Sequence, residues 1–397
     1  MPNSEVRIGL EQVVKASPLV MQGARLGLLM NQASVDQSLR YSCDVLAEAF
    51  PQQLTTLFTP QHGLWGEQQA NMIESSHTVH PQLGIPVHSL YSETRRPTAA
   101  MLKNVDCFVI DLQDVGTRVY TFIWTVSHCL EACVAAGIPV VVLDRPNPLG
   151  GELVEGPMLE TGQESFVGRA PIPMRHGLTL GELTLVVNDL LKIGADVHVV
   201  PLSGWQREMT WQATNRKWIW PSPNVPRPES TAVYPGMVLL EGTNLSEGRG
   251  TTMPFEVFGA PYVDPYLLAT TLKQYSLPGV DFLPLRFVPT FDKWRGESCG
   301  GVLLQVADAN AFRPVLTSSL SLAVIRTLWP QEFCWLSPPY EYETEKPPID
   351  IIAGTSKLRQ KIDAIAQNKL PKRDEIEQVL GFDQDAWHEL CRPYLRV

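Results

Sequence analysis

The chain has 397 residues, of which 44% are hydrophobic and 19% charged, and its formal net charge is -10. This length suits a large domain joined to a smaller one, and the composition is that of a globular protein. The acidic balance, without any run of Lys or Arg, argues against nucleic acid as a partner.

The opening residues and the hydropathy pattern bear on localisation. Residues 1–10 lack a basic segment followed by an apolar one, and no stretch reaches the roughly 18 apolar residues that a membrane span needs. The seven cysteines are odd in number and form no C-x-x-C pair, which is typical of reduced thiols. We therefore expect a cytoplasmic protein without a membrane partner.

The first half of the chain alternates short apolar runs with helical stretches. Apolar runs of this length between helices are typical of parallel strands that are buried on both faces. The predicted strands are residues 26–30, 54–59, 87–90, 105–111, 138–143 and 197–202. The pattern predicts βαβ units, and hence an α/β, Rossmann-like domain with a mostly parallel, doubly wound sheet.

Helices are expected between these strands. The helical stretches are residues 39–50, 98–103, 119–136 and 179–193. Gly137 is a stop signal for the third helix, and Thr179 with Glu182 suits a capping box at the start of the fourth.

A stretch rich in Pro and Trp, residues 205–235, interrupts the alternation. Beyond it the order of elements is mixed, with helices expected at residues 234–241, 317–329 and 383–394 and strands at 282–287 and 301–306. This mixture indicates a smaller α+β domain. We therefore predict a Rossmann-like domain over residues 1–222 and a smaller domain over residues 223–397 that closes a cleft.

Polar residues follow four of the predicted strands, at residues 31–32, 59–63, 111–118 and 144–148. Ligands of open α/β sheets gather outside the carboxyl ends of the strands. Each exit taken alone is explained by a turn or a helix cap, for which Asn, Asp, Pro and Gly are favoured. Four polar exits at one edge of a sheet favour a binding site, because their polar groups need solvent or a ligand.

The segment 240–252 is dense in Gly, Ser, Thr and charged residues, which is typical of a loop. Its Glu241, Glu247 and Arg249 would supply an acid, a base and an anion-binding group across from the first domain. The alternative is an ordinary solvated loop.

Several other chemistries find little support. His77 and His80 have no third metal ligand nearby in the sequence, so a solvated loop is the better interpretation. The chain contains no G-x-S-x-G elbow, no G-x-G-x-x-G and no Walker A motif. We expect neither a metal nor a nucleotide, and no serine-hydrolase triad.

A set of motifs, in order along nearly the whole chain, resembles the exo-β-N-acetylmuramidases of the NamZ family, formerly a family of unknown function. The matching segments are TPQHG (59–63), VHSLYSETRRP (87–97), DLQDVGTRVY (111–120), VVLDRPNPLGG (141–151), VEGPM (154–158), PIPMRHGLTLGEL (171–183), PSPN (221–224), the segment 241–250 and PFEVFGAP (254–261). The ordered series is far more specific than any single motif.

The resemblance implies an enzyme that removes terminal N-acetylmuramic acid from the non-reducing end of peptidoglycan fragments. It implies a Rossmann-like amino-terminal domain, a smaller carboxy-terminal domain and no cofactor, with a peptidoglycan-derived saccharide as the partner. This chain departs from the family at Gln61, where many members carry Glu in a Pro-Glu-His-Gly motif. If that Glu is catalytic, either Glu67 or Glu74 replaces it here, or the activity is altered.

Glycoside hydrolysis normally uses two carboxyl groups, one as acid and one as base or nucleophile. On the resemblance, the candidates for this pair are Glu67, Asp114, Glu241 and Glu247. A second possibility stays open, in which the acetamido oxygen of the sugar is the nucleophile.

Substrate contacts are expected from the same edge of the sheet. An arginine would grip the lactyl carboxylate of the sugar in a bidentate manner, and the candidates are Arg118, Arg145 and Arg249. Hydrogen bonds to hydroxyls and the acetamido group are expected from His62, Asn224 and Tyr234, and further binding candidates are Asn31, Gln61, Glu74 and Asp144.

Two other functions remain as alternatives. Gln61 is compatible with a sugar-binding protein that has lost turnover. A nucleotide-sugar or phosphate-using transferase would need a glycine-rich loop after the first strand, and residues 30–36 contain no Gly.

Overall fold

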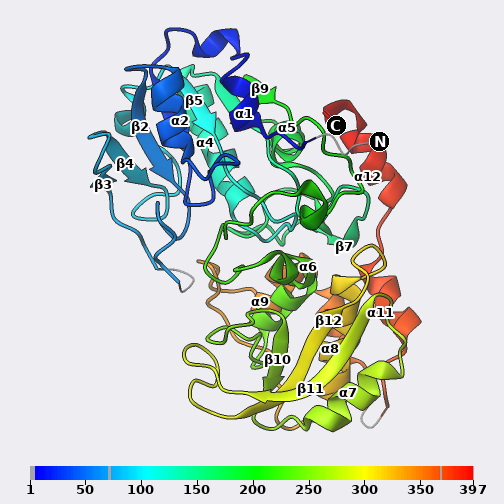
Figure 1. The fold of residues 1–397 in the computed structure, drawn as a ribbon. Helices are drawn as coiled ribbons and strands as arrows, with labels where there is room; N and C mark the ends of the chain where they lie inside the picture. The colour runs from blue at the N-terminus through cyan, green and yellow to red at the C-terminus, as the bar shows by residue number, and fades with distance from the viewer. Residues whose placement is uncertain (1–4, 70–72, 367–368, 397) are drawn as a thin grey trace.

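The structure is a computed structural model that describes residues 5–69, 73–366 and 369–396, and it forms two lobes (Figure 1). One lobe is built on a seven-stranded sheet, and the other on a three-stranded antiparallel sheet, with helices against both. A small two-stranded sheet pairs β7 (Glu155–Met158) with β8 (Pro173–Arg175). The predicted α/β class, with a mostly parallel sheet and a second, smaller domain, is confirmed.

The large sheet has the order β3-β4-β2-β1-β5-β6-β9. All its neighbouring pairs are parallel except β3 with β4. The strands are β1 (Leu26–Leu29), β2 (Leu54–Thr59), β3 (Thr78–Val79), β4 (Pro86–Ser89), β5 (Cys107–Ile110), β6 (Val140–Leu143) and β9 (Val197–Val200). The chain moves outward from β1 to β4 and then returns to β5 on the other side of β1, so the sheet is doubly wound.

Two of the helices of this lobe end or begin at the signals seen in the sequence, and the short helix α1 was not predicted. They are α1 (Gly9–Val13), α2 (Ser42–Ala49), α3 (Ala99–Leu102), α4 (Phe122–Ala136) and α5 (Leu180–Leu190). Helix α4 ends at Gly137, whose φ of 68° is left-handed and favours glycine. Helix α5 begins with the predicted capping box, in which Thr179 accepts from the Glu182 amide and Glu182 accepts from the Thr179 amide.

In the second lobe the strand order is β10-β12-β11. The elements are α6 (Pro228–Met237), β10 (Val257–Ala260), α7 (Pro265–Lys273), β11 (Val280–Phe287), β12 (Cys299–Val306), α8 (Pro314–Leu328), α9 (Pro348–Ala353), α10 (Lys357–Asp363), α11 (Arg373–Leu380) and α12 (Gln384–Cys391). Short 3-10 turns are η1 (Leu19–Met21), η2 (Trp211–Thr214), η3 (Val238–Gly242) and η4 (Arg392–Tyr394). The helix expected at residues 234–241 is the end of α6 followed by η3.

The carboxy-terminal helix α12 returns to the first lobe (Figure 1). The indole of Trp387 donates to the carbonyl of His176 at 3.1 Å, and the amide of Arg396 donates to the Glu182 carboxylate at 3.0 Å. The predicted division at residue 222 groups this helix with the second domain, although its contacts are with elements of the first.

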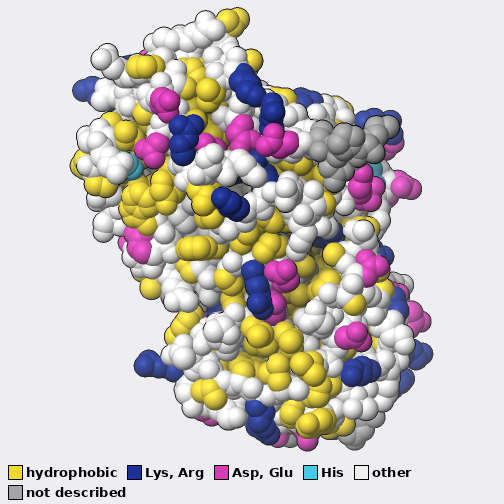
Figure 2. Space-filling view, in the orientation of Figure 1, with side chains coloured by type: hydrophobic (Ala, Val, Ile, Leu, Met, Phe, Trp, Pro, Cys, Tyr) yellow, Lys and Arg dark blue, Asp and Glu magenta, His cyan; other side chains and the backbone are white. Residues whose placement is uncertain are grey.

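The surface carries both signs of charge. On the face shown in Figure 2, basic and acidic side chains are interspersed rather than segregated. Among the helices of the described residues, none combines the length and the apolar character that crossing a bilayer requires.

A buried ion pair at the carboxyl ends of the central strands provides a test of the fold. Arg145 contacts the Asp111 carboxylate through Nε at 2.6 Å and Nη2 at 2.8 Å, and both side chains are buried. Asp111→Ala leaves the arginine buried without its partner, and we expect a loss of about 3–5 kcal/mol in unfolding free energy by urea titration. Asp106→Ala breaks the exposed pair with Arg25 and serves as the control, with little change expected. Equal effects of the two substitutions would contradict this interpretation.

Candidate active site

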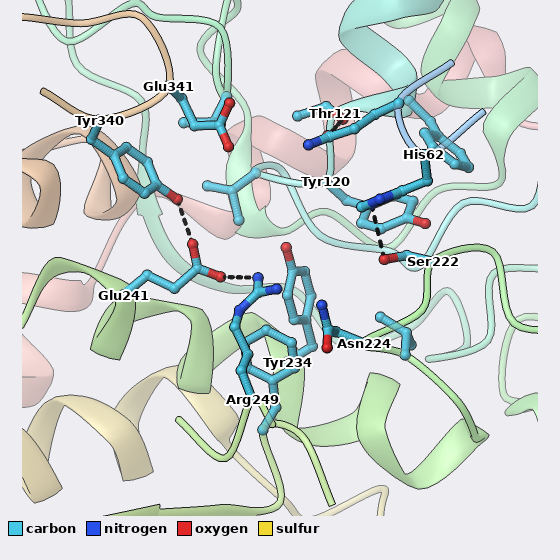
Figure 3. A pocket seen from close by; sticks show the side chains of 16 residues that line it. His62, Tyr120, Thr121, Ser222, Asn224, Tyr234, Glu241, Arg249, Tyr340 and Glu341 are labelled. Carbon is cyan, nitrogen blue, oxygen red and sulfur yellow. Dashed lines mark hydrogen bonds and ion pairs between the residues drawn. The ribbon is translucent and has the colours of Figure 1, made fainter. Parts of the chain in front are cut away.

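A pocket with about 470 Å³ of empty volume lies where the two lobes meet (Figure 3). The first lobe contributes the exit of β2 and the start of α4, and the second contributes α6, η3 and two loops. The polar side chains that line it are Gln61, His62, Tyr120, Thr121, Ser222, Asn224, Tyr234, Glu241, Arg249, Tyr340 and Glu341. The apolar ones are Val119, Phe122, Val167, Val225 and Phe255.

The pocket lies away from the crevice between β1 and β5, where the strand order reverses. Protein groups occupy that crevice: the Asn31 side chain donates to the Pro221 carbonyl at 3.0 Å, and Ser34 donates to the Asp111 carbonyl. The Arg145 guanidinium pairs with the Asp111 carboxylate in the same region. These contacts place protein groups in the crevice, and the pocket opens beside the exit of β2 and the start of α4.

The wall from the first lobe holds Gln61 against the start of α4. The Thr121 hydroxyl donates to Oε1 of Gln61 at 2.9 Å, and Thr121 is the residue that precedes α4. The amino-terminal end of this helix therefore faces the pocket and contributes positive potential. The neighbouring Tyr120 hydroxyl is buried and has no hydrogen-bond partner among the described residues.

His62 is a neutral, oriented imidazole. Its Nδ1 is 2.6 Å from the Gln68 carbonyl, which only accepts, so Nδ1 carries the proton. Its Nε2, 3.1 Å from the Ser222 hydroxyl, is then the acceptor. Burial and, to a smaller extent, the charge of Arg249 lower the pKa of His62, while the hydrogen bond to the Gln68 carbonyl opposes them. The resulting pKa is about 4.

The wall from the second lobe is a chain of buried charges. Nη2 of Arg249 lies 2.6 Å from Oε1 of Glu241, and its Nε lies 3.1 Å from Oε1 of Glu247. Nζ of Lys293 lies 2.9 Å from the other oxygen of Glu247. Burial alone would raise the pKa of Glu247, but Lys293 and Arg249 hold it below its ordinary value. Two carboxylates and two cations therefore balance one another behind the pocket surface.

Glu241 reaches the pocket from this chain. The Tyr340 hydroxyl donates to its Oε2 at 2.7 Å, while its Oε1 receives Arg249 (Figure 3). Both oxygens of Glu241 are therefore engaged by side chains of the second lobe.

Glu341 has a different environment. The Tyr91 hydroxyl donates to its Oε2 at 3.3 Å, and its other oxygen makes no hydrogen bond with the described residues. Burial, together with the negative charge of Glu241, raises the pKa of Glu341 to about 7. This carboxyl therefore keeps its proton in mildly acidic solution.

Three lining residues have left-handed backbone conformations that non-glycine residues seldom adopt. Their φ angles are 76° at His62, 65° at Phe255 and 44° at Glu341. Such strain persists only where the surroundings hold it, and it collects at functional sites. Three strained residues in one pocket support its choice as the candidate site.

The structure brings six of the predicted site residues to the pocket: Gln61, His62, Asn224, Tyr234, Glu241 and Arg249. Asn224 also donates to the Gln69 carbonyl at 3.1 Å and so ties down the loop after β2.

Four predicted substrate-binding residues are buried in structural contacts outside the pocket lining. Arg118 donates to three backbone carbonyls, and burial lowers its pKa to about 9. The Asp144 carboxylate accepts from Gly181, and burial raises its pKa to about 7. Arg145 and Asn31 are the groups that fill the crevice described above. At these four positions the polar residues make structural contacts, in line with the alternative that polar strand ends serve turns and helix caps.

The remaining predicted carboxylates also lie outside the lining. Glu67 and Glu74 are exposed, and Glu74 lies 3.7 Å from Arg95. Asp114 is buried and accepts from the Gly116 amide at 2.6 Å. Glu247 lies behind Arg249. Of the four predicted catalytic carboxylates, only Glu241 lines the pocket.

The sequence interpretation missed Tyr120, Thr121, Ser222, Tyr340 and Glu341. The first three stand inside or beside motifs that were noted, so proximity in sequence would have found them. No motif or periodicity marks residues 340–341, which reach the pocket only through the fold.

Comparison with known proteins decides the family. Models of exo-beta-N-acetylmuramidase NamZ match residues 26–229 with its N-terminal part and residues 232–396 with its C-terminal part. The chain belongs to the NamZ family. It is 44% identical over 359 residues to peptidoglycan beta-N-acetylmuramidase NamZ of Bacillus subtilis (strain 168), which covers 90% of this chain and 84% of that protein.

Solved structures of the same shape come from Bacteroides fragilis NCTC 9343. Two DUF1343 family proteins match with TM-scores of 0.87 and 0.74, at 32% and 28% identity, and each match covers 99% of both chains. The two-lobed arrangement of this NamZ-family chain is therefore shared with experimentally determined structures.

The state of His62 in this NamZ-family pocket can be measured directly. We expect the imidazole to stay neutral from pH 8 down to about pH 5, because its pKa is about 4 in the folded protein. Imidazole nitrogen shifts in NMR spectra report this, with His62→Gln identifying the signal.

The lowered pKa of His62 also makes the stability of the folded protein depend on pH. The unfolded ring binds a proton near its ordinary pKa of about 6.5, so between that pH and 4 the unfolded state holds more protons, and stability falls as the pH falls. A folded protein whose His62 is protonated at pH 6 would refute the assignment.

Proposed function

We propose that this protein is an exo-acting glycosidase that releases terminal N-acetylmuramic acid from the non-reducing end of peptidoglycan fragments. Its family and the name of its Bacillus subtilis relative, a peptidoglycan beta-N-acetylmuramidase, support the substrate class. The observation that carries the proposal is the pocket at the lobe junction, where the ionised carboxylate of Glu241 faces a polar cavity. Glycoside hydrolysis passes through a positively charged, oxocarbenium-like state, which such a carboxylate stabilises.

The walls of the pocket suit the apolar face of a sugar ring. Tyr234 makes edge-to-face ring contacts with Tyr120 and with Phe255. All three side chains line the pocket, and together they give a rigid surface against which a sugar ring can pack.

Polar groups in the pocket match the substituents of N-acetylmuramic acid. The Tyr120 hydroxyl is unpartnered among the described residues, and Asn224 and Ser222 lie in the same wall. The amino-terminal end of α4 supplies positive potential for a lactyl carboxylate.

The activity test uses a chromogenic N-acetylmuramide and short muropeptides over a pH series. We expect release of one N-acetylmuramic acid from the non-reducing end and no cleavage of fragments that end in another sugar. Glu241→Gln should lower kcat/KM by about 10²–10³-fold, because it removes a charge that stabilises the transition state. Glu208→Gln, an exposed glutamate outside the pocket lining, is the matched control. A wild-type protein that releases no sugar from either substrate rules the proposal out.

Gln61 favours a second candidate, a protein that binds the sugar without turning it over. An amide cannot exchange a proton with the leaving oxygen, and the Gln61 amide lines the pocket beside Thr121.

Gln61→Glu separates the two candidates. Under the glycosidase proposal the wild-type chain already hydrolyses the chromogenic substrate, and the substitution is not needed for turnover. Calorimetric binding of N-acetylmuramic acid to the wild type, with hydrolysis only in Gln61→Glu, would select the binding protein instead.

A further inference from the structure

Glycoside cleavage in this pocket needs a proton donor, and Gln61 does not provide one. Among the described residues that line the pocket, the carboxyl groups are those of Glu241 and Glu341. Glu241 is committed to Arg249 and Tyr340, each of which contacts one of its two oxygens. Glu341 is the carboxyl that remains.

We propose that Glu341 is the general acid of the reaction, a role that rests on the proposed glycosidase function. It would take the place that a carboxyl at position 61 cannot take in this chain. Its burial, the hydrogen bond that it accepts from Tyr91 and its place above Glu241 among the pocket-lining side chains in Figure 3 carry the assignment.

The turn that holds Glu341 is built at a conformational cost. The backbones of Tyr340 and Glu343 exchange two hydrogen bonds of 2.9 Å, which closes a two-residue turn. Its central residues, Glu341 and Tyr342, have φ angles of 44° and 70°. Positive φ at both central positions is the pattern of a type I′ turn, for which Asn-Gly is strongly preferred. A glutamate and a tyrosine there are poor choices for turn stability alone.

Contacts with the first lobe hold this strained turn in place. The guanidinium of Arg95 lies over the ring of Tyr91 at 4.2 Å and over the ring of Tyr342 at 4.8 Å. The Tyr91 hydroxyl donates to Glu341 itself. The turn comes from the second lobe, so these contacts fix its carboxyl across the junction.

The surroundings of Glu341 favour a proton at neutral pH. The charged and titratable groups around it are Tyr91, Arg95, Tyr234, Glu241, Arg249, Tyr340 and Tyr342. Burial and the charge of Glu241 raise its pKa, while the Tyr91 hydroxyl, Arg249 and Arg95 oppose them, and the balance lies at about 7. A general acid near this value is well matched to neutral solution.

Water is the co-reactant in the hydrolysis. The bond between the anomeric carbon and the leaving oxygen breaks, its electron pair stays on that oxygen, and the oxygen takes the proton of Glu341. Water then adds its hydroxyl to the anomeric carbon, and its remaining proton returns to the Glu341 carboxylate. The enzyme ends in its starting state.

Glu341→Gln tests the assignment through the leaving group. We expect kcat on a natural disaccharide, whose leaving alcohol needs protonation, to fall by about 10²–10⁴-fold. On a dinitrophenyl glycoside, whose leaving group needs no proton, the loss should be small. The alkaline limb of the wild-type pH profile, near 7, should disappear in the variant. Glu343→Gln, in the same turn but outside the pocket lining, is the matched control.

Binding and stability readouts separate a catalytic role from a structural one. Gln retains an acceptor for Tyr91, so the variant should bind N-acetylmuramic acid as the wild type does in calorimetry. The unfolded Glu341 ionises near 4.5 and the folded one near 7, so this group lowers stability as the pH rises between those values. Glu341→Gln should therefore unfold at a higher temperature than the wild type at pH 8.

The outcomes distinguish this inference from the proposed function. A wild type that hydrolyses neither glycoside overturns both. A variant as active as the wild type on both glycosides, or one that loses both equally together with binding, overturns the role of Glu341 alone.

Discussion

The pairing of a buried arginine, Arg249, with two carboxylates is the interaction on which the site depends. Arg249 lies buried between Glu241 and Glu247, and Lys293 completes the neutralisation of Glu247 from behind. Burial opposes the charged form of an arginine, yet the two carboxylates raise the pKa of Arg249 above its ordinary value. A buried charge is tolerated only when it is paired and hydrogen-bonded. The chain of four charges therefore explains how an ionised carboxylate can stand at a pocket surface between two lobes.

That same charge gives the two carboxyls of the pocket different chemistry. Glu241 is paired with Arg249, and after burial the negative charge of Glu241 is the next cause that raises the pKa of Glu341. A buried carboxyl beside a like charge keeps its proton more readily than one in water. The left-handed backbone conformations of Glu341 and His62 are also strained, and contacts across the lobe junction hold the turn of Glu341 in place.

The pocket does not lie at the position where a doubly wound sheet usually binds its ligand. In a doubly wound sheet the crevice where the strand order reverses is the usual ligand site. Here that crevice is filled by Asn31 and by the pair of Arg145 with Asp111. The open space lies instead beyond β2, against the amino-terminal end of α4, and the second lobe supplies its other wall. The candidate site of this chain therefore lies at a junction between lobes rather than on the sheet alone.

The sequence by itself determined the architecture, because its signals are local. Apolar runs predicted the parallel strands, and Gly137 and the Thr179 capping box marked helix ends by short-range geometry. Six site residues were also predicted, since they lie in motifs or directly after a strand. The two-residue strand β3 gave no signal, because both of its residues are exposed.

Only the tertiary structure decided which polar groups are available to a ligand. Arg118, Arg145, Asp144 and Asn31 have the same residue types as a binding site, but each is satisfied by partners that are distant in sequence. Glu341 is the opposite case. It lines the pocket, although it lies 100 residues beyond Glu241 in a segment without a motif. Burial and pairing across the lobe junction set the protonation of that carboxyl, and neither can be read from neighbouring residues.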